Sequence, residues 1–211
     1  MVARRGLGTK VNRMRARLSF SRWMIVLVGL VVAACSSTVE REPIPALTYG
    51  HLPPIEVLVA RVEVIDEYQS PLREPNVEHT FPMPPAAAFR QWVEDRLRGV
   101  GQNNTLRITI IEASALRVPL PRTEGVEGLF TTDQVERIDA TVDVLLEIVD
   151  NGGLTAASIS ARTQRSRSMA EGLSLDERDK FFQELSEALV NDLNATIEQN
   201  MRQNLAGYLA S

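Results

Sequence analysis

The chain has 211 residues, of which 44% are hydrophobic and 5% aromatic, enough for one ordinary core but not for two. A single cysteine excludes an intramolecular disulfide and a cysteine zinc cluster. The formal net charge is −4, and positions 1–34 hold seven basic residues and no acidic one, so removing them takes the charge to −11. So acidic a chain repels phosphate backbones, and nucleic-acid binding is not expected.

Residues 1–34 have the anatomy of a signal peptide. A basic stretch precedes an uncharged apolar run over residues 24–34, which ends in small residues. As a helix, this run covers about 17 Å, well short of the ~30 Å hydrocarbon core of a bilayer. The segment is therefore predicted to be a cleaved leader rather than a permanent span. It is compatible with a translation start at Met1 or at Met14.

The end of the leader resembles the lipobox of bacterial lipoproteins. It reads Val32-Ala33-Ala34-Cys35, an aliphatic residue, two small residues and the cysteine at the cut site. The resemblance implies cleavage before Cys35, a diacylglycerol on its thiol and an acyl group on the new amino terminus. Ser36 in place of aspartate implies export to the outer membrane, with the domain facing the periplasm. No other cofactor is expected.

The mature chain begins with a proline-rich segment. Residues 35–53 show no hydrophobic periodicity and are interpreted as a flexible, lipid-anchored tether. Apolar residues then alternate from 55 to 65, with one change of phase near Ala60. This pattern predicts one long strand with a bulge at that point.

A helix and two strands are expected next. Residues 85–98 place apolar side chains on one helical face, and Gly99 and Gly101 are expected to end this helix. Alternation over residues 106–120 and 138–148 predicts two strands. The second strand carries aliphatic residues on one side and mostly acidic residues and threonine on the other, so one face of the sheet should be wet.

A hairpin and a long helix complete the predicted domain. Asp-Asn-Gly-Gly at 150–153 is a strong turn signal leading into a strand over residues 154–168. Ser174 and Glu177 fit a capping box that opens the last helix. Its apolar residues recur at four-residue steps, so the apolar stripe winds around the axis. Either the helix bends near residues 191–194, or its far end contacts something other than the sheet.

Together these elements predict an α+β fold: a four-stranded, mostly antiparallel sheet with two helices on one face, in the order β-α-β-β-β-α. Residues 54–211 are expected to form this single periplasmic domain. With the anchor, the order of elements resembles the small envelope lipoproteins of the LptE, YajG and PqiC kind, although no residue motif is shared. The resemblance implies an accessory subunit of an outer-membrane or lipid-transport machine.

The residue types needed for catalysis are sparse. The two histidines, His51 and His79, lie in proline-rich segments without an orienting carboxylate at helical or strand spacing, and no Gly-x-Ser-x-Gly motif is present. Asp139 and Asp143 share one face of a predicted strand, but alternating acids on an open sheet face are usually solvated. No catalytic residue, no metal site and no enzymatic activity are therefore predicted.

Two features are candidate partner-binding sites. Arg162, Arg165 and Arg167 concentrate positive charge in an acidic domain, either to guard a strand end or to dock an anionic partner or lipid phosphate. Leu129 and Phe130 lie beside glycines in a long connection and either fold onto the core or face a partner. The hypothesis is a membrane-tethered binding subunit with an envelope protein partner. The alternative is a structural lipoprotein that self-associates through its C-terminal helix.

Overall fold

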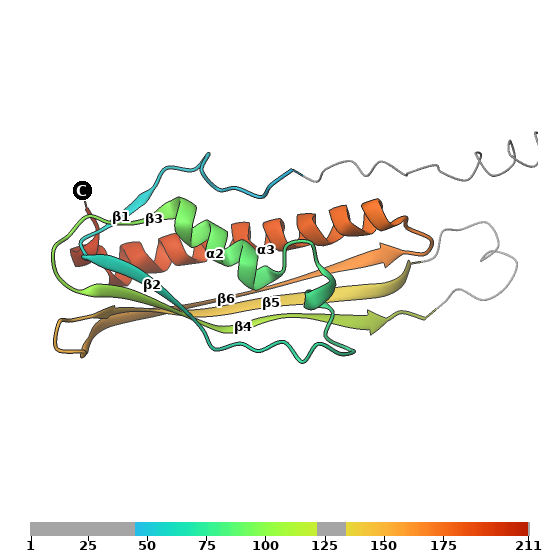
Figure 1. Ribbon diagram of the computed structural model, residues 1–211, viewed down its shortest axis with the longest axis horizontal. Coiled ribbons are helices and arrows are strands. Elements are labelled where there is room, and N and C mark those ends of the chain that lie inside the picture. Colours follow the sequence, from blue (N-terminus) through green and yellow to red (C-terminus); the bar gives the residue numbers. More distant parts are fainter. Residues whose placement is uncertain (1–44, 122–133, 211) are drawn as a thin grey trace, which may run out of the picture. The chain divides into compact units, whose positions relative to one another are not determined.

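The computed structural model describes residues 45–121 and 134–210. Their elements are β1 (Ile55–Val57), β2 (Arg61–Asp66), η2 (Glu78–Thr80), α2 (Pro85–Arg96), β3 (Leu97–Gly99), β4 (Thr105–Pro119), β5 (Gln134–Val149), β6 (Thr155–Ala170), α3 (Leu175–Asn204) and η4 (Ala206–Tyr208). The long strands form one layer, and α2 and α3 lie together on one face of it (Figure 1). The predicted α+β class and two-layer arrangement are confirmed.

The main sheet has the strand order β2-β4-β5-β6. The pair β2–β4 is parallel, and the pairs β4–β5 and β5–β6 are antiparallel. A bulge interrupts β4 between Ile110 and Glu112, where the sequence changes phase. The aliphatic face of β5 is completely buried beneath the helices, as predicted, at Ile138, Ala140, Val142, Val144, Leu146 and Ile148.

The prediction of one strand over residues 55–65 is wrong. The chain forms β1 and β2 in two different sheets, because β1 pairs in parallel with β3, whereas β2 joins β4. Between them, the amide of Ala60 donates to the carbonyl groups of Asn103 and Asn104, which turns the backbone away from β1. The change of phase in the sequence therefore marks a break between strands, not a bulge.

The first helix is also shorter than expected. It ends at Arg96, and residues 97–99 continue directly as β3. The glycines permit close strand approach rather than ending the helix. A Cβ on Gly99 would lie 2.8 Å from the Val59 oxygen, and one on Gly101 would lie 2.5 Å from the carbonyl carbon of Leu58.

The last helix runs unbroken over thirty residues. It opens with the predicted capping box: the Ser174 hydroxyl accepts from the Glu177 amide, and the Glu177 carboxylate accepts from the Ser174 amide. The helix therefore does not break near residues 191–194, and its far end instead contacts a segment outside the main sheet. Leu205 is fully buried, and the chain after it pairs with β1 through a bridge between Leu209 and Val57 and a hydrogen bond from the Ala210 amide to the Glu56 carbonyl.

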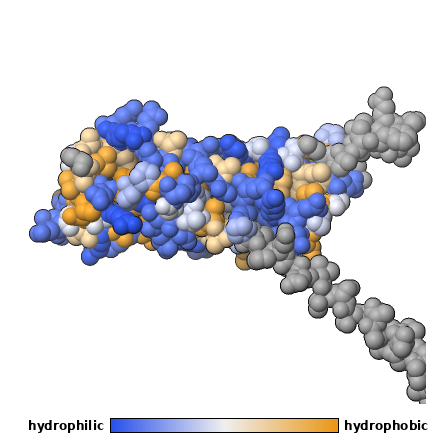
Figure 2. Space-filling view, turned by 90° about the horizontal axis from the view of Figure 1, so that it is seen from above, coloured by the Kyte–Doolittle hydropathy of each residue, from blue (hydrophilic) through white to orange (hydrophobic). Residues whose placement is uncertain are grey.

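The surface above the helical layer is largely hydrophilic, with hydrophobic residues more frequent toward the end that carries β1 and β3 (Figure 2). Leu58 and Val100, which follow β1 and β3, are 44% and 48% exposed. Within residues 45–121 and 134–210, no helix combines the length and hydropathy required to cross a membrane.

Candidate functional site

Residues 45–53, which the sequence assigned to the flexible tether, pack against the helical layer. We call this segment the strap. Leu47 and Tyr49 are buried, at 7% and 1% exposure. The side chain of Gln183 on α3 donates to the Pro45 carbonyl at 2.7 Å, and the Leu52 amide donates to the Tyr49 carbonyl. The folded unit therefore includes the strap, and the rest of the expected tether, residues 35–44, lies outside the described residues.

Asp95 on α2 fixes the middle of the strap. Its Oδ2 atom accepts from the Tyr49 amide at 2.6 Å and from the Thr48 hydroxyl at 2.9 Å, while Oδ1 accepts from Gln91 at 2.9 Å. Burial by itself raises the pKa of Asp95, but these hydrogen bonds outweigh it and hold the pKa below its ordinary value. The carboxylate is therefore charged at neutral pH and acts as a clamp.

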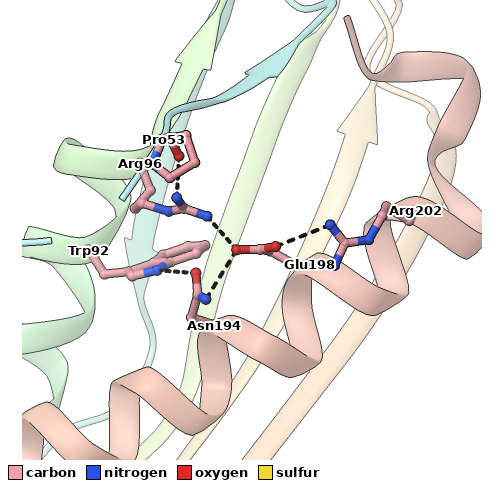
Figure 3. Close-up of polar contacts among 6 residues, drawn as sticks. All are labelled: Pro53, Trp92, Arg96, Asn194, Glu198 and Arg202. Atoms are coloured by element: carbon pink, nitrogen blue, oxygen red, sulfur yellow. Dashed lines mark hydrogen bonds and ion pairs between the residues drawn. The ribbon is translucent and has the colours of Figure 1, made fainter. Parts of the chain in front are cut away.

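A buried polar cluster, the joint, connects the end of the strap to both helices (Figure 3). Arg96 of α2, 2% exposed, donates to the Pro53 carbonyl and to Glu198 of α3. Asn194 donates to the same Glu198 oxygen at 3.1 Å and accepts from the indole of Trp92 at 2.9 Å. A single network thus holds the strap, α2 and α3 together.

The joint is asymmetric in its access to water. The carboxylate of Glu198 is 24% exposed and has a further partner in Arg202, whose Nη1 donates to Oε2 at 3.2 Å. The guanidinium of Arg96 is enclosed, and its Nε has no hydrogen-bond partner among the described residues. The buried charge therefore depends on Glu198 far more than Glu198 depends on it.

A second clamp closes part of the sheet edge. Glu78, 3% exposed, accepts from Ser70 at 2.5 Å, from Tyr68 at 2.7 Å and from the Ala115 amide of β4 at 3.1 Å. Burial raises the pKa of Glu78, but the hydrogen bonds outweigh that effect and lower it. The charged carboxylate secures the loop before η2 against β4.

The tyrosines and histidines of the described residues differ in burial. Burial is the main cause that raises the pKa of Tyr49 and of Tyr68, so both phenols are neutral at physiological pH and poor nucleophiles. His51 and His79 are exposed. Among residues 45–121 and 134–210 there is no group of three histidine or acidic side chains placed to hold a metal ion.

The three candidate arginines do not form one patch. Arg162 lies on the outer face of the sheet, where it pairs with Glu112 and Asp143, both at 2.9 Å. The other two lie on the opposite face and pair with α3, Arg165 with Asp192 at 2.8 Å and Arg167 with Glu184 at 2.9 Å. The alternation of side chains along a strand separates them.

On the outer face of the sheet, acidic side chains are paired with arginines. Asp139 pairs with Arg137 at 2.7 Å, and this bond is the largest cause that lowers the pKa of Asp139. Asp143 is held by Arg162. The remaining predicted sites, Cys35 with its lipid and the pair Leu129 and Phe130, lie outside the described residues.

Sequence reasoning missed the joint, although a signal was present. Arg96 follows Trp92 by four residues and Val93 by three, so it falls on the apolar face of its helix. A charged residue at such a position requires a buried partner. Nothing in the sequence identified that partner as Glu198, because it lies about a hundred residues further along the chain.

No protein-family model and no curated protein matches the chain. Among solved structures, it is similar to a minor lipoprotein from Acinetobacter baumannii, with 11% identity and a TM-score of 0.37, covering 74% of this chain and 98% of that one. It is also similar to the rare lipoprotein B from Shewanella oneidensis, with 13% identity and a TM-score of 0.34, covering 67% and 98%. At these values the likeness carries no argument about function.

Proposed function

We propose that the mature protein is a membrane-tethered, non-enzymatic lipoprotein that acts as an accessory or binding subunit of an envelope assembly or lipid-transport complex. Cys35 carries a diacylglycerol and an N-acyl group, and the domain faces the periplasm from the outer membrane. The observation that carries the proposal is the attachment of the chain after the lipobox to the helical layer through the strap and the joint.

The strap limits the distance between the domain and the bilayer. If Cys35 is the anchor, the nine residues 36–44 separate it from the packed strap. Fully extended, they span at most about 35 Å. Several acyl chains hold such an anchor stably, because one chain alone gives marginal binding and each buried methylene adds about 0.8 kcal/mol. The domain is thus kept within reach of membrane-embedded partners.

The polar groups of the domain support binding rather than catalysis. Glu78 and the half-buried Asp95 accept hydrogen bonds from backbone and side-chain donors that hold them in place, as Glu78 does from Ala115 and Asp95 from Tyr49. A catalytic acid or base requires instead a poised group facing a cleft.

The alternative, self-association through the C-terminal helix, finds less support. The apolar stripe of α3 is buried inside the domain, at Phe181, Phe182, Leu185, Leu189, Val190, Leu193, Ile197 and Met201. A helix that mediates assembly needs an apolar face left over for the partner.

The test uses the full chain with its own leader, produced in a bacterium with two membranes. Cys35→Ala should abolish incorporation of labelled palmitate and block cleavage after Ala34, so that the chain keeps its leader. Ser37→Ala, two residues beyond the lipobox cysteine, is the matched control and should be processed normally. Retention and unchanged cleavage of the Cys35→Ala protein would refute the anchor. Cross-linking in intact cells that yields no stoichiometric envelope protein or lipid would refute the binding role.

A further inference from the structure

The two long edges of the main sheet differ in how far other segments of the chain cover them. Beyond its pairing with β2, the edge of β4 is closed by the preceding loop: the Val77 amide donates to the Ala115 carbonyl, the Arg117 amide donates to the Pro75 carbonyl, and Glu78 accepts from the Ala115 amide. The opposite edge is β6, sixteen residues long, with no strand beyond it in the sheet. Proteins usually protect an edge of this length.

Alternate residues of β6 direct their backbone groups to this open edge. The Ser160 carbonyl accepts from the side chain of Asn200 at 2.8 Å, so it points away from β5. In an antiparallel pair, alternate residues bond to the neighbouring strand, so Ser158, Arg162 and Gln164 face the edge as Ser160 does. Apart from Ser160, no backbone or side-chain partner is present for these groups among the described residues.

The usual protections are absent or displaced. Strand β6 contains no proline. Its residues 157–168 pair without interruption with residues 137–148 of β5. Its charged side chains could guard the edge, but carboxylates draw them over the two faces: Arg162 toward Asp143 and Glu112 on one side, Arg165 and Arg167 toward α3 on the other. The edge backbone is therefore left accessible.

The charge of β6 indicates what kind of segment could bind along its edge. The strand holds three arginines and no acidic residue, in a chain whose mature charge is −11. The three side chains remain 45–55% exposed, and a guanidinium has five N–H donors, of which the intramolecular pairs use one or two. A strand laid along the edge would place its own alternating side chains beside these arginines on both faces.

We propose that the edge of β6 is a docking site for an extended, acidic segment of a partner protein, which adds a fifth strand to the sheet. This inference deepens the proposed binding role and rests on it. Backbone hydrogen bonds supply the part of the affinity that does not depend on the side chains. Glutamate or aspartate on one face of the added strand pairs with Arg162, and acidic residues on its other face pair with Arg165 and Arg167. A second copy of this chain is a poorer occupant, because two β6 strands would bring six arginines to one seam.

The test measures amide exchange in the mature lipidated chain in detergent micelles. The probe is a synthetic peptide of about nine residues, roughly 30 Å long as a strand, in which valine and threonine are interspersed with glutamates at both odd and even positions, so that both faces of the strand carry acids. The comparison peptides carry lysine in place of glutamate or reproduce residues 155–170. The glutamate peptide should slow exchange at Ser158, Arg162 and Gln164, and its affinity should fall with added salt.

Two variants separate backbone pairing from charge. Gln164→Pro removes an N–H that faces the edge and should weaken peptide binding roughly tenfold relative to the matched Gln164→Thr. Arg162→Gln combined with Arg167→Gln keeps the backbone intact, leaves Arg165 and should strongly reduce the preference for glutamate over lysine. This double variant also keeps the proposal testable if the proline variant does not fold.

Three outcomes would overturn the inference: no protection of β6 by the glutamate peptide, equal binding of the lysine peptide, or tighter binding of the β6 peptide with dimerisation of the chain. Failure here leaves palmitate labelling and membrane retention unchanged. The Cys35→Ala chain, purified in the same detergent, should bind the peptide as the lipidated chain does, so the two proposals are tested separately.

Discussion

The joint makes a quantitative prediction about two substitutions in one ion pair. Glu198→Ala leaves the guanidinium of Arg96 charged and 2% exposed, with only the Pro53 carbonyl as partner. Breaking a buried pair in this way costs about 3–5 kcal/mol. Arg96→Met removes the buried charge and retains most of the apolar stem, while the carboxylate of Glu198 keeps Asn194, Arg202 and water. The bond lost at Pro53 then costs about 1–2 kcal/mol.

Urea unfolding followed by tryptophan fluorescence measures the difference. The chain has two tryptophans, Trp23 in the leader and Trp92 in the joint, so in the mature protein the signal comes from Trp92 alone. Arg202→Ala is the matched control. Its side chain is 67% exposed, and the loss of this helical pair should change the free energy of unfolding by about 0.5 kcal/mol or less.

The expected order of stability is wild type, Arg202→Ala, Arg96→Met and then Glu198→Ala. The double variant Arg96→Met with Glu198→Leu should recover most of the loss of Glu198→Ala, because no buried charge is left without a partner. If Glu198→Ala destabilises less than Arg96→Met, the reasoning from the asymmetric burial is refuted.

Further predictions concern the strap, the glycines and the last helix. Because the folded pKa of Asp95 is lowered, its stabilising effect is complete above the ordinary value of 3.8 and is lost as pH falls through the folded pKa. The protection of the strap amides, measured relative to an unfolded chain at the same pH, should therefore fall below about pH 3.8 in the wild type and should already be low at pH 7 in Asp95→Asn. Gly101→Ala should lower the free energy of unfolding by about 1–3 kcal/mol, since its Cβ would meet backbone atoms, whereas Gly207→Ala, with open space around it, should be nearly neutral in the same urea titration. Ser174→Ala should cost about 1 kcal/mol by calorimetry through loss of the capping box; an unchanged transition would show that the cap does not stabilise α3.

The structure also changes the interpretation of the arginines. Read along the sequence, Arg162, Arg165 and Arg167 are one basic cluster. In the fold, the first belongs to the outer sheet face and the other two belong to the interface with α3, where Arg167 also stacks on Phe181 with 4.6 Å between the guanidinium carbon and the ring centroid. What the three arginines share is their position on β6, the strand at the open edge of the sheet, and the sequence does not reveal that this strand is at the edge.

The sequence by itself determined the long strands, the last helix and the side of the sheet that is buried. These features follow from local periodicity and capping: the alternation along β5 marks its buried face, and Ser174 with Glu177 marks the start of α3. Such patterns are local because side-chain direction repeats every two residues in a strand and every 3.6 in a helix.

Only the tertiary structure decided how distant segments meet. It divided residues 55–66 between two sheets, placed the strap on the helices and joined Arg96 to Glu198. These pairings are set by which polar groups can be satisfied together once the apolar faces are buried, and that requirement connects positions about a hundred residues apart. A proline-rich segment without periodicity therefore appears free in the sequence, although the folded helices supply the partners that hold it.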